Sequence, residues 1–131
     1  MKKLLLLLFF VVSIITNAQT SVTGQITTNT TWTLANSPYI ITGNILVPSG
    51  VTLTIEPGVV VKVNNGLYIK TEGIINAIGT DTNQIIFESS EVTSDKSKWK
   101  GIIIRPTGGS IVDTNQNYIS GSKFENVVLK N

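Results

Sequence analysis

Short runs of apolar, strand-forming residues recur along this chain about every two dozen residues, and this repeat constrains the fold more than any other feature. When the chain is cut at its turns, the runs fall into three rows of three. The rows are NILV (44–47), LYIK (67–70) and IIIR (102–105); LTIE (53–56), INAI (75–78) and SIVD (110–113); and VVKV (60–63), IFES (86–89) and FENV (124–127). Valine, isoleucine and threonine dominate these runs, and no segment after residue 20 keeps the periodicity of an amphipathic helix.

The spacing within the rows indicates one insertion. From first to second member the rows step by 23, 22 and 26 residues, and from second to third by 35, 35 and 38. A single polar insertion at residues 90–100, SEVTSDKSKWK, would account for the longer step in all three rows. Three short strands per period of this length predict an all-β solenoid, the right-handed parallel β-helix, with about three coils behind an N-terminal cap.

The segment between residues 51 and 63 illustrates the predicted geometry. Glu56, Pro57 and Gly58 separate two strand-like runs. Glycine permits an unusual φ and proline gives up a hydrogen-bond donor, so this tripeptide is expected to turn the chain between two sheets. The alternative is an antiparallel sandwich or barrel, for which Asn65-Gly66 is the best hairpin candidate.

The first 18 residues have the layout of a secretory signal peptide. Lys2 and Lys3 precede an apolar run of 12 residues, and Thr16-Asn17-Ala18 supplies the small residues of a cleavage site. That run is short for a membrane span, so we expect no span after cleavage. The predicted organisation is a signal peptide (1–18), an N-terminal cap region (19–43) and β-helix coils (44–131).

Composition excludes several kinds of chemistry. The chain has neither histidine nor cysteine, which rules out a histidine base, histidine or thiolate metal ligands, and disulfides. Once Lys2 and Lys3 are removed with the signal, eight basic residues balance eight acidic ones. The electrostatic case for nucleic-acid binding is therefore lost, and no nucleic-acid partner is expected.

The ordered motifs resemble the N-terminal coils of secreted β-helix proteins of the pectin-lyase-like superfamily. The resemblance covers about residues 39–105 and rests on Gly50 before TLTI, Glu56-Pro57-Gly58, the segment from Gly73 to Thr80, and WKGIII from Trp99. It implies the fold more strongly than any activity, because such coils occur in polysaccharide-degrading enzymes and in surface adhesins.

The resemblance also bears on the two ends of the chain. Residues 20–43 are expected to form the N-terminal cover, with Trp32 and Tyr39 over the end of the apolar interior. The last residues, FENVVLKN, continue a strand-like pattern, so we expect the chain to be truncated there.

Charged residues offer few catalytic candidates. Those worth inspection are Glu88, Glu91, Asp95, Lys96, Lys98, Arg105 and Asp113. A lyase-type site needs acids and a lysine or arginine facing one groove, and a glycosidase needs two facing carboxylates. No three acidic residues share a row, so we expect these charged residues to be ordinary solvent-exposed surface charges without a catalytic role. Trp99 could stack on a sugar, but packing at the start of the next strand is favoured.

We therefore predict a secreted or cell-surface module with a structural or carbohydrate-associating role. No catalytic, cofactor or metal site is visible in it, and whether it is an enzyme stays uncertain, with "no" favoured for this chain alone. The alternative is the N-terminal part of a polysaccharide lyase or glycoside hydrolase whose catalytic coils lie beyond residue 131. Candidate partners are extracellular polysaccharide, cell-surface components, and further copies of the chain joined end to end.

Overall fold

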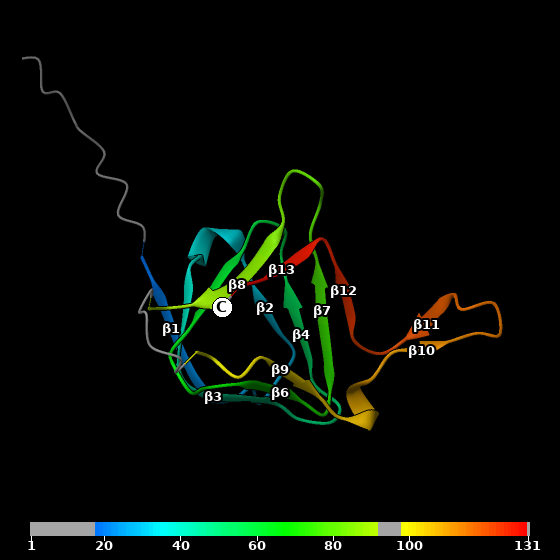
Figure 1. Cartoon of the computed structure of the whole chain (residues 1–131). Helices are drawn as coiled ribbons and strands as arrows, with labels where there is room; N and C mark the ends of the chain where they lie inside the picture. Colours follow the sequence, from blue (N-terminus) through cyan, green and yellow to red (C-terminus); the bar gives the residue numbers. More distant parts are fainter. Residues whose placement is uncertain (1–17, 92–97, 131) are drawn as a thin grey trace, which may run out of the picture.

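A computed structural model of the chain describes residues 18–91 and 98–130, and nearly all of its regular structure is β-strand (Figure 1). The elements are β1 (Thr20–Gln25), β2 (Thr30–Trp32), η1 (Leu34–Asn36), β3 (Tyr39–Val47), β4 (Thr52–Ile55), β5 (Val60–Val63), β6 (Ile69–Thr71), β7 (Ile74–Ile78), β8 (Ile85–Ser89), β9 (Ile102–Ile104), η2 (Pro106–Gly108), β10 (Ile111–Val112), β11 (Tyr118–Ser120), β12 (Lys123–Glu125) and β13 (Val127–Leu129). Most strands are short because the chain turns a corner after each one, whereas β3, nine residues long, continues through a corner.

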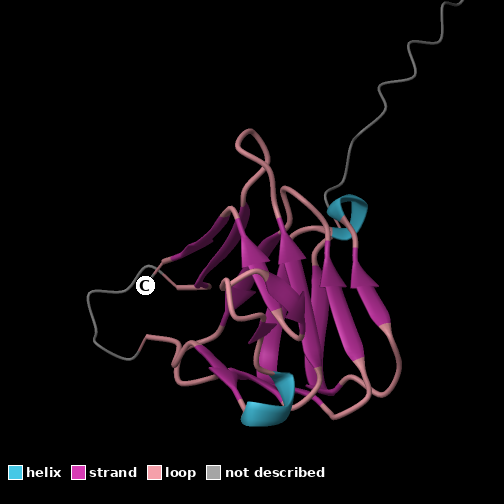
Figure 2. Cartoon of the chain, turned by 90° about the vertical axis from the view of Figure 1, so that its right-hand side faces the viewer, coloured by secondary structure: helices cyan, strands magenta, loops and turns pink. Residues whose placement is uncertain are grey.

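The strands form a solenoid with three faces. Face A holds the second half of β3, then β6 and β9; face B holds β2, β4, β7 and β12; face C holds the first half of β3, then β5, β8 and β13. β1 runs alongside both halves of β3. Every one of these pairings is parallel and joins one coil to the next, as the aligned arrows in Figure 2 show. The predicted parallel β-helix is therefore confirmed.

The corner at Glu56-Pro57-Gly58 lies where the sequence predicts it. β4 before it belongs to face B and β5 after it belongs to face C. Gly58 has a φ of +82°, a left-handed conformation that favours glycine. The Glu56 carboxylate also accepts the Leu34 N–H at 2.8 Å, which fastens this corner to the preceding coil.

Asn65-Gly66 forms a second corner of this kind. β5 and β6 on either side of it lie on different faces and pair with different halves of β3. The alternative of a hairpin at this point is therefore wrong.

Inward-facing side chains stack into columns across the coils. On face B, Trp32, Ile55 and Ala77 are register partners, and on face C the same holds for Val61 and Phe87. All five are nearly inaccessible to solvent. In each strand every second side chain points inward, so every added coil extends the apolar core by one layer.

The register predicted for the first two coils is correct on two faces. Leu53 pairs with Ile75, and Val60 pairs with Ile86, as the rows require. On face A, Ile45 pairs with Ile69 instead of with Tyr68, a slip of one residue. The residues of LYIK could not by themselves distinguish these two alignments.

The third members of all three rows are misplaced. On face A the strand is correct but its register slips by two residues, because Ile102 pairs with Ile69 and not with Leu67. Residues 110–113 do not join face B, since β10 pairs with β11 in an antiparallel hairpin outside the coils. Phe124 lies on face B opposite Ala77, and Val127 begins the face C strand opposite Ile85. This hairpin is a second insertion, which the single-insertion hypothesis lacked.

Candidate functional site

Face A presents a polar and aromatic outer surface. Alternation along β6 turns Ile69 and Thr71 inward, where both are buried, and turns Tyr68, Lys70 and Glu72 outward. The start of the strand is held in place because Asn44 Oδ1 accepts the Tyr68 N–H at 3.1 Å. Tyr68 is half-buried, so part of the residue is accessible to a ligand.

Positive charge collects on this face. Lys70 Nζ lies 2.5 Å from Glu72 Oε1. Lys98, Lys100 and Arg105 are exposed on the next coil, before and after β9. Among the described residues, the carboxylates near these four cations are that of Glu72, on which Lys70 and Arg105 act, and that of Glu91 at the adjoining corner.

Two backbone contacts place the lysines that precede β9 beside the start of β6. The carbonyl of Lys98 accepts the Gly66 N–H at 3.2 Å, and the N–H of Lys100 donates to the Leu67 carbonyl at 2.7 Å. Both lysines therefore lie close to Tyr68, on the adjacent coil. We refer to Tyr68, Lys70, Glu72, Lys98, Lys100 and Arg105 together as the basic face.

The electrostatic coupling within the basic face is visible in the pKa of Glu72. The hydrogen bond from Lys70 lowers this pKa, as do the charge of Lys70 and, to a smaller extent, the charge of Arg105. Glu72 therefore stays ionised to lower pH than an isolated glutamate, and it neutralises only part of the surrounding positive charge.

A network of amides and hydroxyls borders the basic face at the corner between face C and face A. Asn65 donates to Glu91 Oε2 at 3.1 Å and accepts from Ser89 Oγ at 3.0 Å. Beside it, Ser90 Oγ donates to Asn64 Oδ1 at 2.7 Å. Glu91, one of the inspected acids, thus takes part in a structural contact between successive corners.

The other inspected charges are dispersed. Glu88 lies on face C, where its carboxylate is 3.6 Å from Lys62 Nζ. Asp113 lies in the turn between β10 and β11, and hydrogen bonds from Asn117 lower its pKa. Asp95 and Lys96 lie outside the described residues. Of the candidates that the structure describes, Lys98 and Arg105 are the two brought together on one face.

Trp99 packs inside the coil, as the sequence favoured. Its ring is stacked on Phe87 with centroids 6.3 Å apart, and only 4% of the residue is exposed. Its indole N–H donates to the Lys130 carbonyl at 2.8 Å. Trp99 therefore cannot serve as a sugar platform, and Tyr68 is the aromatic residue that the basic face offers instead.

Tyr68, Lys70 and Glu72 were not predicted as site residues from the sequence. Their signal was the alternation Y-x-K-x-E across one strand, which predicts a shared outward side. Across residues 18–91 and 98–130, no three acidic side chains are grouped so as to hold a metal ion. The same residues contain no helix of sufficient length and apolarity to cross a bilayer.

Coiled parallel strands with an apolar interior and a polar outer face define the class of β-helix domains. Comparison with known families narrows the assignment: the profile of the pectate-lyase-like β-helix domain matches residues 24–125. The chain belongs to this family.

A fruit-fly protein is also similar to part of the chain. Protein bark beetle of Drosophila melanogaster is 33% identical over 72 residues, which is 55% of this chain and 2% of that protein. The chain thus spans a very small part of the relative that it matches. No solved structure matches significantly.

Proposed function

We propose that this chain is a secreted β-helix module that associates with acidic polysaccharide through the basic face. The observation that carries the proposal is the excess of cations around an outward tyrosine on one sheet of the solenoid. Lys70 and Arg105 come from successive coils and the charges of both act on Glu72, so they lie on the same side of the solenoid. A chain of carboxylated sugars presents a matching series of negative charges.

The chemistry of the basic face suits a sugar acid. Lysine and arginine bind carboxylates by charge-assisted hydrogen bonds, and arginine can do so with two parallel bonds. Tyr68 is a partly exposed residue that combines an aromatic ring with a polar hydroxyl, which suits contact with the apolar side of a sugar. The surface is open, which favours binding of an extended polymer over capture of a small molecule.

Two further observations support an extracellular setting. The predicted signal peptide at residues 1–18 would direct the chain into the secretory route. Membership in the pectate-lyase-like β-helix family is compatible with a carbohydrate-related role. Mass spectrometry of the exported chain tests the first point, with an N-terminus at Gln19 as the expected result.

The binding test compares two double variants that remove the same charge from different faces. Lys70→Gln with Arg105→Gln reduces the basic face, whereas Lys62→Gln with Lys130→Gln reduces face C. We expect the first variant to weaken binding to polygalacturonate about tenfold, equivalent to about 1.4 kcal/mol, and the second less than about twofold. Added salt should weaken the unmodified chain's binding, since exposed charges are screened.

Two results would reject the proposal. One is equal weakening by both double variants, which would mean that only net charge matters. The other is equal affinity for polygalacturonate and for a neutral dextran, which would make the cations irrelevant.

The alternative, the first coils of a polysaccharide lyase or glycoside hydrolase, is favoured by the family to which the chain belongs. In that case the basic face would extend a substrate groove whose catalytic residues lie beyond residue 131. Incubation of the chain with polygalacturonate separates the two proposals. Release of unsaturated uronate or of new reducing ends by this chain would contradict the non-catalytic role.

A further inference from the structure

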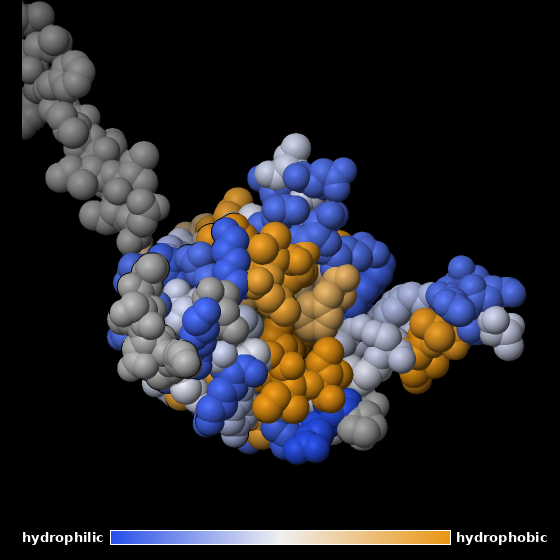
Figure 3. All heavy atoms as spheres, viewed as in Figure 1, coloured by the Kyte–Doolittle hydropathy of each residue, from blue (hydrophilic) through white to orange (hydrophobic). Residues whose placement is uncertain are grey.

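A two-stranded hairpin stands out from the side of the solenoid. β10 and β11 leave the corner between face A and face B and extend beyond the outline of the coils, to the right in Figure 1. Because this arm lies beside the stack, its exposure does not depend on the number of coils. Its apolar residues are exposed to solvent: Ile111 (58%), Val112 (51%), Tyr118 (43%) and Ile119 (59%). Figure 3 shows apolar atoms along the arm, between the coils and a hydrophilic tip, and such a grouping indicates an interaction surface.

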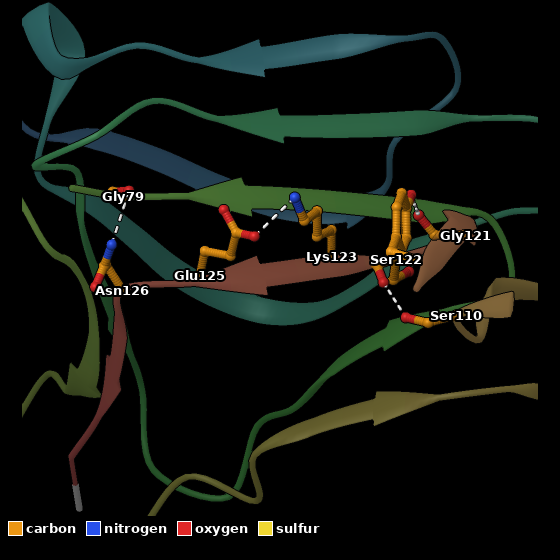
Figure 4. Close-up of polar contacts among 8 residues, drawn as sticks. Gly79, Ser110, Gly121, Ser122, Lys123, Glu125 and Asn126 are labelled. Carbon is orange, nitrogen blue, oxygen red and sulfur yellow. Dashed lines mark hydrogen bonds and ion pairs between the residues drawn. The ribbon is translucent and has the colours of Figure 1, made fainter. Parts of the chain in front are cut away.

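Hydrogen bonds hold the arm in place at its base. The Ser110 hydroxyl donates to the Ser122 carbonyl, a contact drawn in Figure 4, and the Tyr118 hydroxyl donates to the Gly121 carbonyl at 2.7 Å. A Cβ at Gly121 would collide with the Gly109 carbonyl oxygen, so the two sides of the base approach each other closely. A preformed arm loses little conformational freedom when it binds.

The turn at the tip is organised by one carboxylate. Asp113 accepts hydrogen bonds from the N–H groups of Asn115 and Asn117, both at 2.8 Å, and from Asn117 Nδ2 at 3.0 Å. Asp113 is also the one charged residue in the segment 109–121. Electrostatic repulsion between two such arms is therefore small.

The two edges of the arm differ in how they are protected. β11 contains an extra residue, Ile119, which makes the strand bulge, and Lys123 Nζ lies 5.4 Å from the centre of the Tyr118 ring. Bulges and lysines are devices that block pairing at the edge of a sheet. β10 has neither, and within the described part of the chain it pairs with β11 alone. The edge of β10 is thus open to a further strand.

The hydrogen-bond pattern of β10 singles out Val112. The Asp113 N–H donates to the Asn117 carbonyl at 2.9 Å, so the backbone of Asp113 is directed toward β11. Because these directions alternate along a strand, the N–H and the C=O of Val112 are both directed away from β11, at the open edge. Val112 lies opposite Tyr118, which places their side chains on the same side of the arm.

We propose that the open edge of β10 pairs with β10 of a second copy, antiparallel and about a two-fold axis at Val112. Two residues that face each other in this way exchange both N–H···O bonds, so each Val112 uses its N–H and its C=O. The Val112 and Tyr118 side chains of both copies then form one apolar stripe across a four-stranded sheet. The contact is closed by symmetry, which makes the product a dimer, and its formation does not require polysaccharide.

The other residues of the strand permit this pairing. In the antiparallel arrangement Asp113 of one copy lies opposite Ile111 of the other, so the two carboxylates do not face each other. β10 is only two residues long, and few hydrogen bonds join the copies. We therefore expect a reversible dimer with a dissociation constant between about 1 μM and 1 mM.

Sedimentation velocity of residues 19–131, the expected secreted form, measures association over a wide concentration range. Val112→Lys should weaken it about tenfold or more, because two like charges then face each other at the axis. Ile119→Lys is the matched control: Ile119 is similarly exposed but lies on β11, away from the paired edges, so association should change less than about twofold. Thermal unfolding of each variant verifies that the monomer fold is retained.

Cross-linking tests the position of the axis. The chain has no cysteine, so one introduced thiol reports on one contact. Val112→Cys places two thiols opposite each other, with Cα atoms about 5.5 Å apart, a separation that a disulfide can span. In a glutathione redox buffer we expect its disulfide-linked dimer to form about tenfold faster than that of Ile119→Cys, because pairing raises the effective concentration of the thiols.

A pair of charge variants tests the register. Ile111→Lys and Ile111→Glu remove the same apolar side chain but place opposite charges facing Asp113 of the other copy. The lysine variant should associate about threefold or more tightly than the glutamate variant, and added salt should reduce the difference.

Four outcomes would overturn the proposal. A chain that stays monomeric at the highest concentration reached would leave the edge to a strand of a different protein. Association that Val112→Lys leaves unchanged would place the contact on another surface. Equal cross-linking rates for the two cysteine variants would exclude the axis at Val112, and equal association of the two Ile111 variants would exclude the antiparallel register.

Discussion

The two ends of the solenoid are built from similar side chains, but they differ in what covers them. At the N-terminal end, Trp32 is 2% exposed and stacks on Tyr39 with ring centroids 4.9 Å apart. At the C-terminal end, Leu129 belongs to the same inward column as Tyr39 but is 59% exposed. Burial in a solenoid is therefore set by the next layer, and large aromatic side chains can serve as that layer.

Truncating one inward-facing residue at each end should give the largest difference in the free energy of unfolding between two variants. Trp32→Ala removes a buried ring and should lower the free energy of unfolding by about 3–5 kcal/mol. Leu129→Ala should lower it by less than about 1 kcal/mol, because little of that side chain is buried in the monomer. Urea unfolding at low protein concentration, where association is negligible, measures both.

A similar loss in both variants would remove the contrast between the ends. It would mean that Leu129 is covered in solution by part of the same chain.

A smaller effect concerns Thr71, which lies one coil in from the open end. Its hydroxyl is buried and has no hydrogen-bond partner among the described residues. Its column neighbours on either side are Val47 and Ile104, so Thr71→Val restores an apolar column. We expect the substitution to raise the free energy of unfolding by about 1 kcal/mol, because an unpaired buried hydroxyl is costly.

The control is Thr54→Val on the outward side of face B, which should change stability by less than about 0.5 kcal/mol. If the last coil opens readily in solution, water reaches the Thr71 hydroxyl and the gain disappears. Thr71→Val therefore reports on how firmly the terminal coil is held.

The smallest effect is on the titration of Glu72. Its lowered pKa stabilises the folded chain above the pKa of an unfolded glutamate, and this contribution is lost as the pH falls through the folded pKa. Lys70→Met should move the pKa back up, toward the ordinary range, and Arg105→Gln should do so less, since Lys70 is the main cause. NMR titration of the Glu72 carboxyl measures both shifts.

Arg105 reaches Glu72 from the terminal coil, so its share of the shift also depends on that coil staying in place. An equal response of the Glu72 pKa to the two substitutions would contradict the dominance of Lys70 over Arg105.

Much of the fold could be predicted because the alternation of inward-facing apolar residues along each strand is visible in the sequence. Leu53 with Ile75 and Val60 with Ile86 were placed in register, since apolar residues and glycine corners mark both coils. The β10–β11 hairpin could not be foreseen in this way. Its residues 110–113 have the same apolar, β-branched character as a coil strand, and local character does not specify the pairing partner.

The basic face was less predictable than the fold. The sequence indicates Arg105 and Lys98 as candidate site charges, but it does not indicate Lys70 or Tyr68. Their common surface arises from pairing between β6 and β9, more than thirty residues apart. A one-residue slip in that register sends a side chain to the opposite side of the sheet, so outward neighbours can be predicted only once the register is known.

The base of the β10–β11 hairpin has a consequence for how such chains change in length. The N–H of Ser122 donates to the Gly108 carbonyl at 3.2 Å, so the chain returns to the stack beside the point where it left. Residues between these two points add length at a corner without altering any pairing between coils. The corners are therefore positions where a foreign peptide could be grafted or a loop shortened, while the same change inside a strand would shift a whole column of the core.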